Sequence, residues 1–510
     1  MQKKILAVII ALIFVTSMGT AAAQVSPQTS SPRNIIVGVV APQQSPVGQD
    51  MYRAARLAVQ EINDAGGVHV SEWNTNVNVT IDLVDTVDDS PGNAVSPVNR
   101  AVTQDGVDLL IGGYGSAGTL ANEVVAIENR VPYIITGASN QLVTRRGPQG
   151  NYGGFGPTGA NSLSDAVGMS YMFHYCTTTY DYSKTVVDFF VNAMKPMVAP
   201  DRQFKLAIMF RNDAFGTGVE AATKYWIQNE SLPITLVDDL SYPTTTTDFQ
   251  TQLTQIKGDQ PDAVFVVDNP DKTPVIIKQG LTEVGLNTVY IGVENNEDPV
   301  FYNLIGQSGN GQLLESKFSP YAGAYLPDVP VYVSNFNKTY SVLPGMMGAD
   351  TYDAFFIAKA AIESAGTLDK AAVRTAIEQT NLNDMLLITP SGKIQFSTGI
   401  NYHEINPVTF VEQLQWNATV NQCIPAIVWP ANVSEVGTIQ QAQFALPAGY
   451  PVASPASTST PASTSSPASS PSSNGNTSGQ DMSMIYIAVA VVVVIAVAAV
   501  GVFYFRKSKK

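Results

Sequence analysis

One stretch, residues 107–144, constrains the fold more than any other part of the chain. It begins with a short apolar run at 107–111, passes through a glycine-rich turn and an amphipathic segment at 119–130, and ends with a second apolar run at 131–135. This order predicts strand, turn, helix and strand, which together form a βαβ unit. Parallel strands joined by helices need both faces of their sheet covered, so an α/β protein is expected.

The turn of this unit has the spacing Gly-x-Gly-x-x-Gly over residues 113–118, which is typical of dinucleotide binding. A nucleotide is not favoured, because the motif does not open the first βαβ unit and the chain has the marks of an exported protein. In addition, the next strand ends in Ser139 and Asn140, where a nucleotide site needs an acid for the ribose. The glycines either only close the turn or bring Ser116 and the helix start close to a small carboxylate ligand.

The two ends of the chain predict export and membrane attachment. Two lysines, an apolar run and three alanines make residues 1–23 a secretory signal peptide. Residues 485–505 form an uninterrupted apolar stretch that is long enough to cross a bilayer. The basic tail at 506–510 stays inside, so we expect a single-pass protein of the cell membrane with an extracellular ectodomain and a cytoplasmic C-terminus.

Residues 448–480 are rich in Ser, Thr, Pro and Ala and have almost nothing bulky to bury, which predicts an extended stalk. The ectodomain, residues 31–447, is too long for one ordinary domain. In an exported protein, Asn-x-Ser/Thr triplets are candidate glycosylation sites. They start at Asn78, Asn229, Asn337, Asn417, Asn432 and Asn476.

Composition narrows the function classes. The chain has 28 basic and 42 acidic residues, and six of the basic residues lie in the two ends, which hold no acids. The remaining excess of acids argues against nucleic acid or anionic lipid as a partner. No metal-binding spacing and no Gly-x-Ser-x-Gly elbow is present, so we expect neither catalysis nor a metal or other cofactor. The sequence does not decide whether Cys176 and Cys423 form a disulfide, because it does not give the distance between them.

Strand-like and helix-like segments alternate along the ectodomain, and the alternation restarts after residue 200. We therefore expect two Rossmann-like lobes with parallel sheets, joined by a hinge that the chain crosses several times and enclosing a cleft. A helical section at 330–379 should return to lobe one, and strands at 394–396 and 408–416 should complete lobe two. The expected boundaries are about 33–173 and 320–390 for lobe one, and 174–319 and 391–447 for lobe two.

Several motifs resemble type I solute-binding proteins, most closely the leucine/isoleucine/valine-binding branch that serves ABC importers. They are the helix sequence at 48–67, Gly115-Ser116, the stretch at 137–144, Phe215-Gly216 and the strand end at 292–294. The resemblance covers nearly all of the ectodomain. It implies a type I periplasmic binding protein fold, to which the sequence adds one C-terminal transmembrane helix.

The resemblance also implies a ligand site. The ligand carboxylate would meet Ser116, Ala138 and Ser139, whereas Glu294 would take an ammonium group from a position at the cleft mouth. Phe215 would close on the ligand from lobe two, and Asn269 would line the cleft. Two departures are a shorter loop at 43–48 and a phenylalanine in place of the usual tyrosine at 215.

The function that this resemblance implies is an extracellular binding protein that delivers a branched-chain type of amino acid to an ABC permease. An amide, a urea-type compound or another small solute is the alternative ligand. A receptor ectodomain that reports its ligand to a signalling partner is the alternative role, since the tail at 506–510 is too short to signal by itself.

Overall fold

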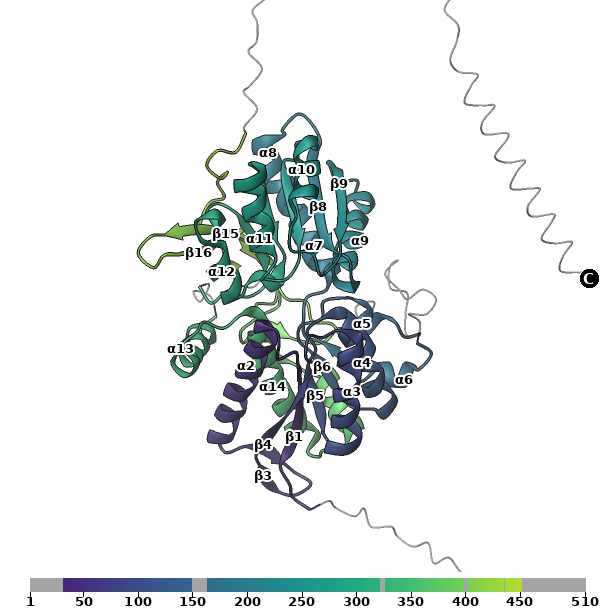
Figure 1. Ribbon diagram of the computed structural model, residues 1–510. Coiled ribbons are helices and arrows are strands. Elements are labelled where there is room, and N and C mark those ends of the chain that lie inside the picture. Colours follow the sequence, from purple (N-terminus) through teal and green to yellow (C-terminus); the bar gives the residue numbers. More distant parts are fainter. Residues whose placement is uncertain (1–30, 149–162, 322–325, 399–401, 435, 452–510) are drawn as a thin grey trace, which may run out of the picture. The chain divides into compact units, whose positions relative to one another are not determined.

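The computed structural model describes residues 31–148, 163–321, 326–398, 402–434 and 436–451 (Figure 1). The predicted signal peptide, most of the stalk, the apolar stretch at 485–505, the basic tail and Asn476 lie outside these residues. Among the described residues, no helix is both long and apolar enough to cross a membrane. All of the described residues belong to one compact unit.

The first lobe is built on a five-stranded parallel sheet with the order β4-β1-β5-β6-β7. Its β5 is buried at every residue, as expected for a strand covered on both faces. The strands are β1 (Ile35–Ala41), β4 (Val79–Asp85), β5 (Leu109–Gly112), β6 (Tyr133–Ile135) and β7 (Met172–His174).

Helices cover both faces of this sheet (Figure 1). On one face, α2 (Pro46–Asp64) packs along α14 (Met346–Ala365), and their side chains join those of Val37 and Val39 in one core. On the other face, α3 (Pro91–Arg100) and α4 (Ser116–Asn129) pack over Val40 and Leu110 in a second core. Successive strand residues point to opposite faces, which is why neighbours such as Val39 and Val40 enter different cores.

The second lobe is built on a seven-stranded sheet with the order β16-β15-β12-β11-β10-β8-β9. Five strands run parallel, as predicted, whereas β15 near one edge pairs antiparallel with both β12 and β16. The strands are β8 (Phe204–Arg211), β9 (Ile234–Tyr242), β10 (Ala263–Val267), β11 (Val289–Gly292), β12 (Leu313–Ser316), β15 (Phe410–Asn417) and β16 (Gln422–Trp429).

Helices also cover both faces of the second sheet. Helices α7 (Thr179–Phe189) and α9 (Ala214–Asn229) share one core with the inward side chains of β8 and β10. Three shorter helices form the core on the other face. They are α10 (Gln250–Asp259), α11 (Thr273–Lys278) and α12 (Pro299–Ile305).

The segment around residue 394 lies in the first lobe, not in the second as expected. There β14 (Lys393–Ile394) pairs with β13 (Leu382–Asn383), and Ile394 and Phe396 enter the core of α2 and α14. The ring of Phe396 meets that of Phe173 edge-on, with centroids 5.1 Å apart. Burial of these two apolar side chains under β7 fixes the segment to lobe one, so lobe two resumes only near β15.

The remaining elements are short or lie at the edges of the two lobes. They are β2 (Val68–Val70), β3 (Thr75–Val77), α5 (Leu142–Arg145), α6 (Ala166–Met169), α8 (Lys195–Val198), α13 (Asp328–Tyr340), α15 (Lys370–Glu378), β17 (Asn432–Val433), β18 (Gly437–Thr438), the π-helical turns η1 (Ala101–Asp105), η3 (Phe190–Met194) and η4 (Gln279–Val284), and the 3₁₀ turns η5 (Glu294–Asn296) and η6 (Gly306–Gly309).

Candidate functional site

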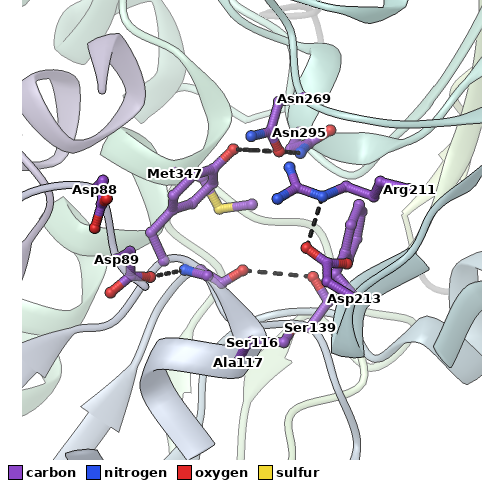
Figure 2. A pocket seen from close by; sticks show the side chains of 14 residues that line it. Asp88, Asp89, Ser116, Ala117, Ser139, Arg211, Asp213, Asn269, Asn295 and Met347 are labelled. Carbon is purple, nitrogen blue, oxygen red and sulfur yellow. Dashed lines mark hydrogen bonds and ion pairs between the residues drawn. The ribbon is translucent and has the colours of Figure 1, made fainter. Parts of the chain in front are cut away.

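A cavity lies where the carboxyl ends of strands from both sheets approach each other (Figure 2). Ligand sites of open parallel sheets form at these strand ends. Its volume is about 80 Å³, which is small because the two lobes already touch across it. The lining residues are Asp88, Asp89, Tyr114, Gly115, Ser116, Ala117, Gly137, Ser139 and Met347 from lobe one, and Arg211, Asp213, Phe215, Asn269 and Asn295 from lobe two.

The two lobes are linked across the cavity by a small hydrogen-bond network. The hydroxyl of Tyr114 donates to Asn269 Oδ1 at 3.1 Å, and Asn295 Nδ2 donates to the same two side chains at 3.3 and 3.2 Å. Burial raises the pKa of Tyr114, so its hydroxyl stays neutral and can both donate and accept. These bonds hold the cleft closed on this side.

Lobe two contributes a cation to the cavity. Arg211 Nε lies 2.6 Å from Asp213 Oδ2, and Nη1 lies 3.5 Å from Asp268 Oδ1. Asp213 also accepts a bond from the amide of Gly216 at 2.9 Å, so it caps the start of α9 while it positions the guanidinium. The terminal nitrogens of Arg211 point toward the centre of the cavity (Figure 2).

Lobe one contributes a carboxylate at the start of α4. The Oδ2 atom of Asp89 accepts a hydrogen bond from the amide of Gly115, the residue before the helix (Figure 2). A Cβ atom on Gly115 or Gly118 would lie 2.6 or 2.3 Å from atoms of Asp89. Gly115 and Gly118 therefore allow the loop after β4 to approach the start of α4 closely. This packing explains two of the three motif glycines, so a bound nucleotide is not needed to account for them.

Four of the six predicted ligand residues line the cavity, namely Ser116, Ser139, Phe215 and Asn269. The Oγ atom of Ser116 accepts a bond from the amide of Asn140 at 3.2 Å, and Ser139 donates its own hydrogen to Glu294 at 2.8 Å. Both serines are thus partly engaged within the protein.

Ala138 does not line the cavity. It is fully buried, and its carbonyl oxygen lies 2.6 Å from His174 Nε2. The ligand roles assigned to all six residues remain predictions, because their positions alone do not show what they bind.

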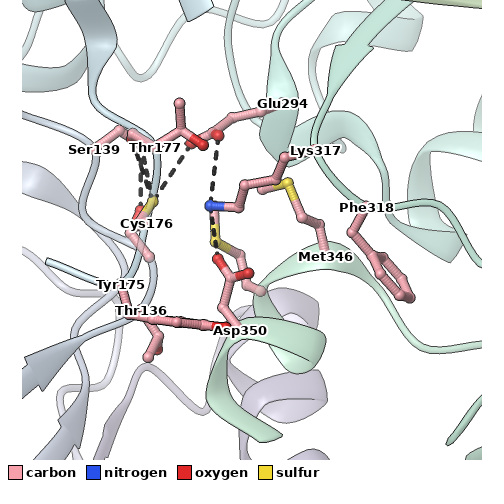
Figure 3. A network of polar contacts seen from close by, with 12 residues as sticks. Thr136, Ser139, Tyr175, Cys176, Thr177, Glu294, Lys317, Phe318, Met346 and Asp350 are labelled. Atoms are coloured by element: carbon pink, nitrogen blue, oxygen red, sulfur yellow. Dashed lines mark hydrogen bonds and ion pairs between the residues drawn. The ribbon is translucent and has the colours of Figure 1, made fainter. Parts of the chain in front are cut away.

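The expectation that Glu294 projects into the cleft mouth is wrong, because its side chain is fully buried (Figure 3). Glu294 begins the short turn η5 and is separated from the end of β11 by one residue, Val293. Its Oε1 atom accepts from Ser139, and its Oε2 atom lies 3.8 Å from Lys317 Nζ. The charge of Glu294 therefore has a partner inside the protein.

Lys317 is held by a second carboxylate, that of Asp350, whose Oδ2 atom lies 2.8 Å from its Nζ atom. Burial by itself lowers the pKa of Lys317, but the negative charge of Asp350 and its neighbours more than offsets this and raises it. Burial raises the pKa of Asp350 to about 7, against the opposing effect of Lys317. Lys317 is thus a permanent cation at the hinge.

Ten of the fourteen lining residues were not among the ligand residues predicted from the sequence. Asp89, Tyr114 and Arg211 each lie at or just beyond the carboxyl end of a strand, and Asn295 lies close to another. The rule that placed Ser116 in the site would have found them as well. Met347 lies at the start of α14 and not at a strand end, so this rule does not predict it.

Cys176 and Cys423 are both free and buried, so the disulfide that the sequence left open does not form. Cys176 follows β7 at the hinge, where its Sγ atom lies 3.6 Å from Glu294 Oε1. Cys423 belongs to β16 and packs in a core of the second lobe. Among the described residues, no group of His, Cys, Asp or Glu side chains could hold a metal ion.

The predicted glycosylation sites within the described residues are accessible to different degrees. Asn78, Asn229, Asn337 and Asn432 are exposed, whereas Asn417 is half-buried. Their modification remains a prediction.

The fold is that of a two-lobed α/β protein with a cavity at the junction of its two sheets. The chain belongs to the periplasmic binding protein family, whose profile matches residues 34–415. The predicted type I binding protein fold is thereby confirmed. The family and its solved neighbours are solute-binding proteins and not enzymes, in agreement with the sequence prediction.

Three similar proteins illustrate the family. Leu/Ile/Val-binding protein homolog 8 of Brucella abortus is 24% identical over 308 residues, which cover 58% of this chain and 67% of the relative. The branched-chain amino acid substrate-binding protein LivJ of Streptococcus pneumoniae, solved with isoleucine, has a TM-score of 0.61 at 18% identity and covers 78% and 100% of the two chains. A solute-binding protein of Rhodopseudomonas palustris was solved with 3,4-dihydroxybenzoic acid. It has a TM-score of 0.62 at 19% identity, and the match covers 77% of this chain and 96% of that protein.

Proposed function

We propose that this chain is the extracellular solute-binding component of an ABC importer and that it takes a small amino acid into the cavity between its lobes. The observation that carries the proposal is the cavity itself, which both lobes line at their strand ends and which the Tyr114–Asn269 bond closes. In the described part of the chain, three segments connect the lobes, following β7, following β12 and preceding β15. Such a hinge suits opening and closing around a ligand.

The ligand chemistry follows from the charges in the cavity. Asp88, Asp89 and Asp213 bring carboxylates, Arg211 brings a guanidinium, and Phe215 adds an apolar surface. A zwitterion with a modest apolar side chain fits this set better than an aromatic acid, which has no group for the carboxylates. The names of the relatives include both kinds of ligand, and the amino-acid names support the assignment.

We further propose that the protein acts at the cell surface. The signal sequence, the Ser/Thr/Pro-rich stalk and the apolar stretch at 485–505 support an anchored ectodomain that passes its ligand to permease subunits in the same membrane. A tethered binding protein does not diffuse away from its permease, so the effective concentration of the ligand-loaded form there stays high.

A thermal-shift screen of the purified protein tests the proposal. Amino acids, amides, sugars and benzoates are compared at millimolar concentration, because a ligand that binds only the folded state raises the melting temperature. We expect leucine or another small amino acid to give the largest rise. A protein that none of these solutes stabilises is not a binding protein for small solutes of this kind.

A further inference from the structure

Two buried aspartates from opposite lobes approach each other outside the lining of the cavity. Asp50 belongs to α2 of lobe one, and Asp298 is the residue before α12 of lobe two. Each residue is only 4% exposed. A Cβ atom on Gly345 would lie 2.9 Å from Asp298 Oδ2 and 3.2 Å from Asp50 Oδ2, so both carboxyl groups approach the same glycine.

The two acids meet where the lobes are in direct contact. Gly345 caps the start of α14 in lobe one, and the amide of the next residue, Met346, donates to the carbonyl oxygen of Glu297 in lobe two at 3.0 Å. Met347, one residue further on, lines the cavity itself. A movement of the lobes that opens the cleft at this point therefore separates the two acids.

Each acid is held in place by its own lobe. The Oδ2 atom of Asp50 accepts a hydrogen bond from the amide of Gly345 at 3.1 Å. The Oδ1 atom of Asp298 accepts from the amide of Val300 at 2.8 Å and so caps α12. The approach of the two carboxyl groups is thus set by the position of the lobes and not by a bond between the acids.

This contact disfavours negative charge. Burial, and then the negative charge of Asp298, raise the pKa of Asp50 well above its ordinary value. Burial raises the pKa of Asp298 to about 6, against the amide of Val300 and the positive charge of Arg53. Two carboxylates that share a desolvated site cannot both be charged without a large cost.

The surrounding groups do not remove this cost. Arg53 of α2 is half-buried and favours the charged form of both acids, but one cation does not neutralise two carboxylates. The other titratable groups that face the pair bring no positive charge. They are Asp271 in the turn after β10, Glu297 before α12, Tyr114 after β5 and Tyr332 of α13.

We propose that closure of the cleft takes up protons at Asp50 and Asp298, so that acidic conditions favour the closed form and neutral or alkaline conditions favour opening. The two acids thus form a pH-sensitive switch at the contact between the lobes. The proposal adds a control of closure to the proposed function and holds whichever solute binds.

The sign of the effect follows from the two forms. In the open form the acids are apart and in water, where an aspartate has a pKa near 3.9. The closed form therefore holds more protons, and its advantage is complete below about pH 3.9 and is lost as the pH rises through about 6 for Asp298. For Asp298 alone, the ratio of closed to open molecules falls about tenfold between pH 5 and pH 8. Asp50 adds to this fall in the same direction.

The distance between the lobes of the ligand-free, full-length protein in detergent micelles tests the proposal. Spin labels are attached to Gln60→Cys in α2 and Thr254→Cys in α10, which are exposed positions, and electron–electron resonance gives the populations of short and long distances at pH 5 and pH 8. The native cysteines are both buried, so they are protected from the label. Asp201→Asn, which removes an exposed acid away from this contact, is the control.

We expect the ratio of closed to open molecules to fall about tenfold or more from pH 5 to pH 8 in the wild-type protein and in Asp201→Asn. Asp298→Asn keeps an oxygen to cap α12 and should show a smaller fall. The double variant Asp50→Asn/Asp298→Asn should have the same ratio at both pH values.

Equal distance distributions at the two pH values in the wild-type protein would overturn the proposal, and so would a wild-type fall in the double variant. Melting curves at both pH values check that the variants are folded. If the double variant does not fold, Asp298→Asn decides, because a fall as large as that of the control would assign the switch to other groups. Since no ligand is added, failure of this proposal is distinct from failure of the proposed solute binding.

Discussion

The ammonium group of Lys317 lies 2.8 Å from the carboxylate of Asp350, and both side chains are fully buried (Figure 3). Lys317 follows β12, where the chain leaves lobe two, and Asp350 belongs to α14 of lobe one. Glu294 of lobe two lies 3.8 Å from the same ammonium group. One cation thus neutralises an acid from each lobe at the hinge.

Removal of this cation should be strongly destabilising. Lys317→Met keeps the length of the side chain but leaves Asp350 and Glu294 buried without a positive partner. We expect the free energy of unfolding at pH 7 to fall by about 3–5 kcal/mol, the usual effect of breaking a buried pair. Urea unfolding measures this, with Lys338→Met at an exposed lysine as the control. A loss as small as that of the control would mean that the pair contributes little.

Glu294→Gln should have little effect on ligand binding. The glutamine can still accept the hydroxyl hydrogen of Ser139, and the cavity does not include residue 294. We expect the affinity for the best amino acid to stay within about a factor of three, or about 0.7 kcal/mol. Calorimetry on the wild-type protein and on Glu294→Gln tests this. A much larger loss in Glu294→Gln would return the ammonium to the site that the sequence resemblance implies.

Much of the fold could be predicted because its signals are local. The apolar runs at 107–111 and 131–135 became β5 and β6, with bounds shifted by two residues or fewer, since each is a short buried strand between clear turns. The antiparallel edge at β15 and β16 and the lobe of Ile394 were not predictable in this way. Both depend on which distant surface buries a short apolar segment, and a two-residue strand has no period of its own.

The site was partly predictable for the same reason. Ser116, Ser139 and Asn269 lie just past strand ends, and this position follows from the alternation of strands and helices. The direction of the Glu294 side chain did not follow, because it depends on a lysine that enters from the crossing segment after β12. Asp89 was missed because it reaches the cavity lining through a left-handed backbone that its sequence does not predict.

A pair of buried acids predicts that stability depends on pH. Glu297 and Glu412 are both buried, and burial raises the pKa of Glu412 to about 7 and that of Glu297 well above its ordinary value. Tyr302 donates to Glu297 at 2.5 Å. In the unfolded chain both acids titrate near pH 4.3. The folded state therefore holds more protons between the two pKa values.

The stability that the pair contributes is complete below about pH 4.3 and is lost as the pH rises through about 7. We expect the melting temperature to fall between pH 5 and pH 8. Glu412→Gln cannot ionise, so it should reduce this fall by roughly 2 °C or more. Calorimetric scans at the two pH values test the prediction, with Glu283→Gln at a surface acid as the control. An equal fall in both variants would assign the dependence to other groups.

The closed cleft depends in part on the hydroxyl of Tyr114. Tyr114→Phe removes the bond to Asn269 across the cavity but keeps the aromatic ring. We expect a shift of about 0.5–1.5 kcal/mol toward the open form. Small-angle scattering of the ligand-free protein should show a larger radius of gyration in the variant, and saturating ligand should reduce the difference. Identical scattering curves without ligand would show that this bond does not control closure.

The last prediction concerns the membrane anchor, and the structure determines where the chain can be cut. The folded part continues beyond Leu446, because the hydroxyl of Tyr450 donates to the carbonyl oxygen of Asp262 at 3.1 Å. Pro447 also packs against Gly311. A chain that ends at Pro451 keeps both contacts, whereas one that ends at Leu446 loses them.

Both truncated chains lack residues 485–505, so we expect them to be secreted in soluble form while the full-length chain stays in the membrane fraction. The shorter one should be less stable by roughly 1–2 kcal/mol, from one lost hydrogen bond and a partly buried aromatic ring. Cell fractionation tests the anchor, and urea unfolding of the two secreted forms tests the cut site. If the chain that ends at Pro451 still sediments with membranes, another segment anchors the protein and the predicted topology is wrong.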